Sequence, residues 1–328
     1  KQSDEYAFLK ECPSQVLQQK LMDQERAFRD CFDRTQPMKR LPVFKKRGVS
    51  DSIRYPQGFR VDNRRIFLPK IGWVGFYKSR EIEGRIKNIT IRRKAGNWYA
   101  SLQVEQEVEL TKHSSDSEIG IDAGINCFAA VSDGTLIKGV HSFRKHEKAL
   151  AKEQRKLARK QKGSENWKRQ KGRISRLHHT IFHVRSDFLH KLSTELSKNH
   201  AVVYVEGLNI RGMSSSTRGT AEDPGSHIKA KAGLNKSILD QGWYEFRRQL
   251  RYKLDWQGGA FAEVDYRYTS QHCSRCGYRS KENRKTQGEF VCLKCGYEEH
   301  ADVNAAKNIL TVGQTGMACG SNRNSSRR

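Results

Sequence analysis

The 328-residue sequence predicts a mixed α/β protein with a β-rich part near its N-terminus and a cysteine module near its C-terminus. Apolar β-branched runs end in carboxylates at Asp122 and Glu206 and alternate with long helical stretches, as in an α/β sheet. Residues 51–110 instead carry short strands separated by turns. Two Cys-x-x-Cys pairs lie within residues 273–295. We expect two or three structural units, which a chain of this length can build.

The N-terminal third predicts one helix and then a set of strands. Residues 14–34 place apolar side chains near helical spacing, with Ser14 as the N-cap. Strands follow within residues 66–74 and 86–105, and the second of these segments turns at 94–97. We interpret this part as a small barrel or sheet with a basic face. Five of its side chains could stack on and clamp RNA, or belong to the core instead: Trp73, Phe76, Tyr77, Arg92 and Arg93.

The remaining two thirds predict a sheet interrupted by helices. Residues 118–140 predict three strands, with a turn at Asp133 and Gly134. Residues 143–196 predict two basic helices, which form either a phosphate-binding arm or a hairpin whose charge serves solubility. The other expected elements are a strand at 201–206, a mobile loop at 212–233, a helix around 237–252, a strand at 260–265 and a disordered tail at 313–328.

The charge of the chain indicates the class of partner. It contains 62 Lys and Arg against 36 Asp and Glu, a formal net charge of +26, with a sequence pI near 9.9. A chain of this charge binds polyanions, and nucleic acid is the leading candidate. No apolar run reaches the length of a membrane span, and the first residues do not resemble a signal peptide. We therefore expect a soluble cytoplasmic protein that does not bind a membrane.

Four cysteines predict a structural zinc site. Cys273, Cys276, Cys292 and Cys295 have the C-x2-C-x15-C-x2-C spacing of a zinc ribbon. Two thiolates two residues apart fit adjacent corners of a tetrahedral ion, and the second pair completes the coordination. A pair of disulfides is the alternative, but the lack of a secretion signal disfavours oxidation.

Three acidic residues, each in a short motif, predict a second metal site. Asp122 and Glu206 end apolar runs, and Asp302 opens a helical segment, so three separate elements could direct carboxylates at one point. Hard divalent cations prefer oxygen ligands, and such a cation would explain the convergence. For Glu206 alone, a salt bridge to an arginine is the structural alternative.

Together these motifs resemble the TnpB family, the OrfB transposases of small bacterial insertion sequences, which are similar in their nuclease half to type V CRISPR effectors. The resemblance extends from about residue 50 onward. It is carried by Gly120–Ile125 with Ser132–Gly134, Glu206–Leu208, Thr269–Gly277, Cys292–Gly296 and Asp302–Ile309. One departure is Gly207, where relatives often have Asp after the glutamate.

The resemblance implies an α/β RNase H-like (RuvC) nuclease with an N-terminal β-barrel-like and helical region and an inserted zinc ribbon. It implies an RNA-guided DNA endonuclease that uses a guide RNA from the transposon end, cuts target DNA and supports maintenance of the element. Asp122, Glu206 and Asp302 would then hold two Mg²⁺ ions about 4 Å apart, with Asp122 as the bridging ligand. Three further residues would line the path of the DNA strand: Arg267, Ser270 and Gln271.

The resemblance and the sequence patterns together give the expected domains. They are a helical remnant of a recognition region at 1–50, a β-rich wedge or barrel domain at 51–113, the first part of the nuclease domain at 114–265 with a basic hairpin at 142–199, a zinc ribbon at 266–299, the last part of the nuclease domain at 300–312, and a disordered tail at 313–328.

The chain begins at Lys1 and lacks the opening strand and helix of the family, so we expect a truncated copy whose activity is in question. A nuclease-inactive or truncated nucleic-acid-binding relic, or a repressor, is the alternative on this scaffold. A strand-transferring transposase and a plain zinc-ribbon RNA-binding protein are the other hypotheses. The presence of all three acids favours the nuclease.

Overall fold

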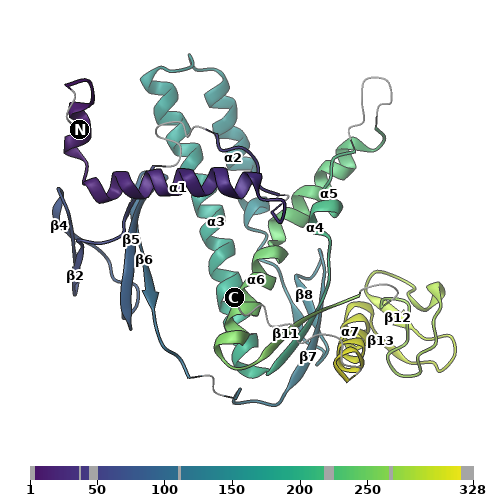
Figure 1. Cartoon of the computed structure of the whole chain (residues 1–328). Coiled ribbons are helices and arrows are strands. Elements are labelled where there is room, and N and C mark those ends of the chain that lie inside the picture. The colour runs from purple at the N-terminus through teal and green to yellow at the C-terminus, as the bar shows by residue number, and fades with distance from the viewer. Residues whose placement is uncertain are drawn as a thin grey trace. The chain divides into compact units, whose positions relative to one another are not determined.

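The computed structural model describes residues 4–36, 38–43, 51–109, 112–217, 225–265 and 269–318. The chain divides into two compact units, Lys1–Glu109 and Leu110–Arg328 (Figure 1). No helix of the described residues has the length and apolar character needed to cross a membrane.

The first unit begins with two helices, the 3-10 helix η1 (Asp4–Glu11) and α1 (Ser14–Phe32). The predicted amphipathic helix is present, but the predicted cap is wrong. Pro13 occupies the N-cap position, and its side chain makes no capping hydrogen bond. Proline fits the start of a helix because its fixed φ is compatible with the first turn and its missing N–H would be unpaired there in any case.

Six strands form two antiparallel sheets around one core in this unit. The first sheet has the order β1-β5-β6 and the second β2-β3-β4; the strands are β1 (Ser52–Tyr55), β2 (Arg60–Asp62), β3 (Arg65–Leu68), β4 (Gly72–Gly75), β5 (Arg85–Lys94) and β6 (Asn97–Glu105). Tyr55 and Ile89 of the first sheet share a hydrophobic core with Ile66 and Leu68 of the second and with Val16 of α1. The predicted turn at 94–97 joins β5 to β6.

The second unit is built on a five-stranded sheet with the order β11-β10-β7-β8-β9. Its strands are β7 (Glu118–Ala123), β8 (Ala129–Val131), β9 (Leu136–Ile137), β10 (Val202–Glu206) and β11 (Ala260–Val264). The strands β7, β10 and β11 are parallel, whereas β8 and β9 are antiparallel to their neighbours. The predicted strand of Asp122 is therefore central, and it ends at the same edge of the sheet as the strand of Glu206.

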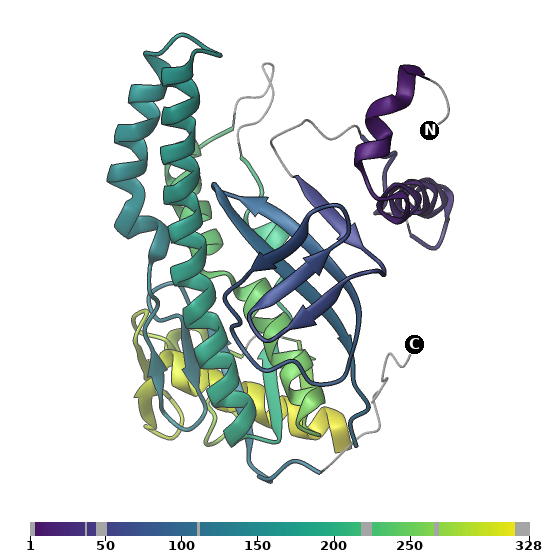
Figure 2. The ribbon, with the colours of Figure 1, turned by 90° about the vertical axis from the view of Figure 1, so that its left-hand side faces the viewer.

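Helices cover both faces of this sheet. They are α2 (Ser142–Ala158), α3 (Glu165–Asn199), α4 (Ile210–Met213), α5 (Ile228–Gln241), α6 (Trp243–Trp256) and α7 (Ala301–Ala318). Side chains of α3 and α6, including Leu189, Phe246 and Leu250, pack on Ile121 and Val203 in the main core. The hairpin of α2 and α3 projects far beyond the sheet (Figures 1 and 2).

The structure corrects three expectations about helix boundaries. The helix around 237–252 is two helices because Gly242 adopts a φ of +77°, and a Cβ there would lie 3.1 Å from Cδ of Arg185. The loop expected at 212–233 already becomes helical at Ile228, and its residues 218–224 lie outside the described part. The tail expected at 313–328 is helical as far as Ala318, while 319–328 are not described.

The ribbon segment lies between β11 and α7. It contains the short 3-10 helix η2 (Lys281–Asn283) and an antiparallel pair, β12 (Glu289–Val291) and β13 (Glu298–His300). Phe290, Cys273, Cys292 and Ala301 form its small core. Arg267, which was expected near the DNA path, lies outside the described residues.

Candidate active site and metal centre

The alternation of side chains along two parallel strands places Asp122 and Glu206 on one face of the sheet. Ile119 and Ile121 of β7 face the main core with Val203 and Val205 of β10. Successive side chains of a strand point to opposite faces, so Asp122 and Glu206 lie on the other face. The helix α7 packs on this second face, where it carries Asp302 in its first turn.

The close approach of α7 to the sheet explains the glycines around the acids. A Cβ on Gly120 would lie 2.2 Å from the carbonyl oxygen of Ala306 and 2.6 Å from the backbone nitrogen of Leu310. A Cβ on Gly313 would lie 2.1 Å from the ring of Tyr204 in β10. Both distances are far below van der Waals contact, so only glycine permits this spacing between helix and sheet. The helix continues past the predicted end because Gly313 packs on Tyr204 and Gln314 donates to Glu118 at 2.9 Å.

The two strand carboxylates share an unfavourable electrostatic environment. Burial and, to a lesser extent, the charge of Asp302 together raise the pKa of Asp122 to about 7, although the positive charge of Arg284 opposes both effects. Burial, together with the charges of Asp122 and Asp302, raises the pKa of Glu206 to about 8, although a hydrogen bond from Thr269 opposes the rise. Carboxylates that repel one another in a buried place are stabilised by a bound cation.

Asp302 differs from Asp122 and Glu206 because an arginine side chain forms a salt bridge with it. Arg284 donates from Nη2 to Oδ1 of Asp302 at 2.9 Å. Among the described residues, the cysteines form the group of metal-ligating side chains whose ligand atoms lie within 4.8 Å of one another; the three acids do not form such a group. The structure thus brings the acids within electrostatic reach of one another, with one oxygen of Asp302 engaged by Arg284.

Sequence reasoning missed Arg284. The chain contains 62 Lys and Arg residues, and nothing in its local sequence distinguishes this one from the others. It follows η2 in the ribbon segment, and only the fold brings it to the start of α7.

The four cysteines are arranged to hold one metal ion such as zinc. Their ligand atoms all lie within 4.8 Å of one another, and the sulfur of Cys273 lies 3.7 Å from that of Cys295. The sulfurs of Cys276 and Cys292 lie 3.5 Å apart. A tetrahedral ion with Zn–S bonds of about 2.3 Å requires sulfurs about 3.8 Å apart, so the set fits.

The backbone of both cysteine pairs folds in the same way. Gly277 and Gly296 follow the pairs with φ values of +71° and +66°, which favour glycine in a tight turn. Their amides donate to the carbonyl oxygens of Cys273 and Cys292 at 2.9 Å. Each pair thus forms a compact knuckle that presents two sulfurs on one side.

The helix that carries Asp302 also holds the entry to the ribbon. Asn304 donates to the carbonyl oxygen of His272 at 2.8 Å and accepts from the amide of Ser274 at 2.9 Å. Asn308 donates to the carbonyl oxygens of Thr269 and His272 at 2.7 and 2.8 Å. Both asparagine side chains are buried. Because Thr269 in turn bonds to Glu206, these contacts link α7, the ribbon and the second acid.

Both asparagines belong to the sequence motif of Asp302, but their role was not predicted. Asn304 and Asn308 are four residues apart, close to the helical repeat that puts two side chains on one face. That spacing was the available signal, and it required knowledge that the ribbon lies against this face.

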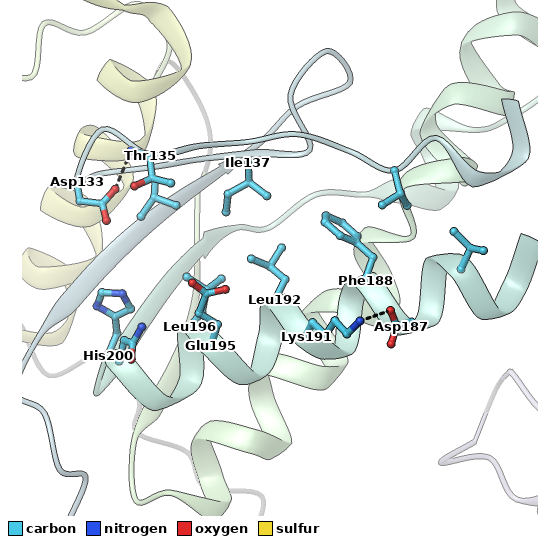
Figure 3. A pocket seen from close by; sticks show the side chains of 14 residues that line it. Asp133, Thr135, Ile137, Asp187, Phe188, Lys191, Leu192, Glu195, Leu196 and His200 are labelled. Atoms are coloured by element: carbon cyan, nitrogen blue, oxygen red, sulfur yellow. Dashed lines mark hydrogen bonds and ion pairs between the residues drawn. The ribbon is translucent and has the colours of Figure 1, made fainter. Parts of the chain in front are cut away.

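A separate cavity lies between the β8–β9 hairpin and α3. It has a volume of about 580 Å³ and is lined in part by Ile137, Phe188 and Leu192, with Asp133 and His200 at one end (Figure 3). None of the three acids lines it. It is therefore not the candidate active site.

Two surfaces have side chains suited to nucleic acid. One exposes many cations, and the other exposes aromatic rings beside an arginine. The α2–α3 hairpin exposes a series of cations: Lys145, Lys148, Lys152, Arg155, Lys156, Arg159, Lys162, Lys168, Arg169, Lys171, Arg173 and Arg176. In the first unit, Tyr77 is 93% and Trp73 48% exposed, and the guanidinium of Arg65 lies 5.4 Å from the ring of Trp73. Phe76 instead packs against the core.

Comparison with known proteins shows where the chain belongs. A family model described as "Probable transposase" (OrfB_IS605) matches residues 101–217, and one for the Cas12f1-like TNB domain matches residues 243–309. The "Putative RNA-guided DNA endonuclease InsQ" of Escherichia coli (strain K12) is 49% identical over 322 residues, which cover 98% of this chain and 79% of that protein. The chain belongs to the TnpB family.

A second relative and one solved structure also match this chain. The "Putative RNA-guided DNA endonuclease" of Streptomyces pristinaespiralis is 32% identical over 332 residues, which cover 98% of this chain and 76% of that protein. The cryo-EM structure of a Cas12f1–sgRNA–target DNA complex matches with a TM-score of 0.47 and 17% identity over 79% of this chain and 59% of that one. The two family models divide the acids between them, since the first includes Asp122 and Glu206 and the second Asp302.

Proposed function

We propose that this chain is a transposon-encoded, RNA-guided DNA endonuclease whose active site is formed by Asp122, Glu206 and Asp302. One observation carries the proposal. Three carboxylates from β7, β10 and α7 converge on one face of the sheet, where burial and mutual repulsion raise the pKa of two of them. Retaining such charges in one place is unfavourable unless a cation neutralises them.

The fold we assign is RNase H-like. Support comes from the strand order β11-β10-β7-β8-β9, in which a central strand is parallel to one neighbour and antiparallel to the other. Asp122 lies on that central strand, and α7 crosses the face on which it lies. For the first unit, one core shared by two small sheets supports a barrel-like arrangement.

The donor set suits Mg²⁺ because all three side chains offer carboxylate oxygens, the ligands that this hard cation prefers. Bound Mg²⁺ would supply activation of a water molecule and stabilisation of the leaving oxygen in phosphodiester hydrolysis. Asp122 interacts electrostatically with both other acids, so it would hold the metal together with Glu206 and Asp302. Arg284 would have to release Oδ1 of Asp302 for that oxygen to bind metal, and its guanidinium could then pair with a phosphate.

The four cysteines would hold structural Zn²⁺. The ion would fix the two knuckles of the ribbon, and Asn304 and Asn308 hold the start of the ribbon, at Thr269 and His272, against α7. The ribbon also carries Arg284 to Asp302, so zinc would position the active site without taking part in the chemistry.

The nucleic-acid partners we assign are a guide RNA from the transposon end and a target DNA. The net charge of +26 and the cations of the α2–α3 hairpin supply a surface for phosphates. Trp73 and Tyr77 expose rings on which bases can stack. The names of the two relatives describe RNA-guided DNA endonucleases.

A nucleic-acid-binding protein without nuclease activity is the alternative, and one observation favours it. Arg284 engages Asp302, and the acids of the described chain do not form a compact ligand group. A site locked in this state would bind RNA and DNA without cutting.

Plasmid cleavage separates the two functions. The protein is purified with its element-end RNA and given Mg²⁺ and supercoiled plasmid that carries a matching target. We expect RNA-dependent linear product from the wild type and none from Asp122→Asn, Glu206→Gln or Asp302→Asn, with RNA and DNA still bound in all four. Binding without any cutting by the wild type would support the alternative function.

A further inference from the structure

Two histidines on the basic hairpin lie unusually close together. His179 and His183 are four residues apart on α3, so their side chains occupy the same face of the helix. Their Nε2 atoms lie 2.9 Å apart, and the ring centroids are 4.1 Å apart at an interplanar angle of 69°. The contact lies at the surface of the helix.

The hydrogen bond between these rings restricts how they can be protonated. A hydrogen bond between two Nε2 atoms needs one donor and one acceptor, so at least one of the two rings carries no proton on Nε2. A neutral imidazole nitrogen is the form that binds metal ions. The accepting Nε2 is therefore a ligand atom in the correct form. The donating Nε2 becomes one when its proton moves to Nδ1 of the same ring or, if that ring is doubly protonated, is released to the solvent as the metal ion binds.

The spacing also matches two ligands of one transition-metal ion. With metal–nitrogen bonds of about 2.0–2.1 Å, two ligands at a right angle are about 2.9 Å apart, and at a tetrahedral angle about 3.4 Å apart. The observed 2.9 Å fits the right angle, which square-planar and octahedral ions adopt. Only a small rotation of the rings would give the tetrahedral spacing.

We propose that His179 and His183 form a surface binding site for a divalent transition-metal ion, with Cu²⁺ and Ni²⁺ preferred over Zn²⁺. The order follows from the general affinities of imidazole sites for these metals and from the right-angle spacing. The ring of Phe182 lies edge-on to His183 with centroids 5.5 Å apart and limits the movement of that ring.

This site is distinct from the two already described. The cysteines of the ribbon offer four ligands, whereas no third His, Cys, Asp or Glu of the described chain joins the histidine pair in a ligand cluster. Two protein ligands leave the other coordination positions to water or to an anionic oxygen. Because Arg173 and Arg176 precede the pair on the same helix, a bound ion would add charge to a surface that suits phosphate.

The test measures metal binding to the untagged protein with its ribbon already loaded with zinc. Cu²⁺ and Ni²⁺ are titrated by calorimetry, and the Cu²⁺ complex is examined by EPR for coupling to two nitrogen nuclei. The variants are His179→Gln and His183→Gln, and His178→Gln is the matched control because it is exposed on the same helix but points about 100° away from its neighbour.

We expect one Cu²⁺ beyond the ribbon zinc in the wild type and in His178→Gln, with a two-nitrogen EPR signal. Each of the other variants should bind that ion at least tenfold more weakly and lose the two-nitrogen signal. Equal affinity in all four proteins would overturn the proposal, and so would an equal loss in His178→Gln. Circular dichroism checks that α3 remains folded in each variant.

Discussion

At the scale of single residues, the raised pKa values of Asp122 and Glu206 make stability depend on pH. The pKa of Glu206 is about 8 in the folded chain against an ordinary value of 4.5, so between these values the folded state binds more protons than the unfolded state. Stability then falls as pH rises through this window. Asp122, with a pKa of about 7 against an ordinary 3.8, acts in the same direction.

The first prediction follows from this loss of stability with rising pH. In Mg²⁺-free buffer with zinc-loaded ribbon, Glu206→Gln should be more stable than the wild type at pH 9 and nearly equal to it at pH 5, because the amide never ionises. Adding Mg²⁺ at pH 9 should stabilise the wild type but not the variant. Thermal unfolding across pH measures both effects, and a wild type that gains stability from pH 5 to 9 relative to the variant would contradict the argument.

The second prediction concerns Arg284, which occupies Oδ1 of Asp302 at 2.9 Å. Replacing it by alanine frees this oxygen and removes a positive charge, so the protein without nucleic acid should bind Mn²⁺, as a substitute for Mg²⁺, severalfold more tightly. EPR titration of free Mn²⁺ gives the affinity. Lys281→Ala, an exposed position of the same ribbon, is the control and should not change it. Weaker Mn²⁺ binding in Arg284→Ala would show that the ion pair does not compete with metal.

The sequence was informative about the acids and uninformative about Arg284, for a physical reason. A carboxylate at the end of an apolar strand is costly to bury, so its presence there signals a role. An arginine in a ribbon of a chain with a net charge of +26 is what solvation alone would produce. Its role depends on a contact across 18 residues, which no local pattern encodes.

At the scale of elements, the distance between α7 and β7 sets the position of Asp302 relative to Asp122. Gly120 permits this distance, since a Cβ would lie 2.2 Å from the carbonyl oxygen of Ala306. That oxygen belongs to the backbone of a helix, so it cannot move without the whole element.

The third prediction is that Gly120→Ala separates helix from strand and costs about 1–3 kcal/mol, the usual range for overpacking. Cleavage should fall more than the folded fraction does, because the acids move apart. Gly172→Ala is the control: a Cβ there meets no atom within 4 Å, and alanine favours a helix interior. Denaturant unfolding and cleavage are measured on both. Unchanged stability in Gly120→Ala would contradict the packing of α7 on β7.

Element types followed from sequence patterns more reliably than element ends did. The three strands within 118–140 and the strand at 201–206 are where the apolar runs and turns predicted them. The break at Gly242 and the extension of α7 to Ala318 were not predicted, because each depends on a tertiary contact. Gly242 packs against Arg185 and Leu189, and Gly313 against Tyr204.

At the scale of the whole molecule, the ribbon and the nuclease sheet form one linked system. Asn304 and Asn308 hold the ribbon entry to α7, Thr269 bonds to Glu206, and Arg284 reaches Asp302. A change in the ribbon should therefore reach all three acids.

The fourth prediction is that removal of zinc abolishes Mg²⁺-dependent cleavage, although the four ribbon cysteines form a ligand group separate from the three proposed active-site acids. Loss of the ion should release the two knuckles, and Cys292→Ala should reproduce the effect. Cys31→Ala, outside the ribbon, is the control. Bound zinc is measured by mass spectrometry beside cleavage, and full activity of a zinc-free preparation would refute the link.

The net charge of +26 and the cysteine spacing indicate a nucleic-acid partner and a metal-binding ribbon from the sequence alone. They could not predict that the ribbon is tied to the acid-bearing helix, because Asn304 and Asn308 bond to backbone atoms more than 30 residues away. Side chains that recognise distant backbone leave no pattern in the partner sequence.

The central claim is that Asp122, Glu206 and Asp302 form one divalent-metal site, and Mn²⁺ bound in the complex with guide RNA and target DNA tests it most directly. Anomalous X-ray scattering locates the ions, with Glu206→Gln measured in parallel. We expect Mn²⁺ contacted by all three carboxylates in the wild type, with Arg284 displaced from Asp302, and reduced occupancy in the variant. An ion-free site in which Arg284 still binds Asp302 would contradict the claim.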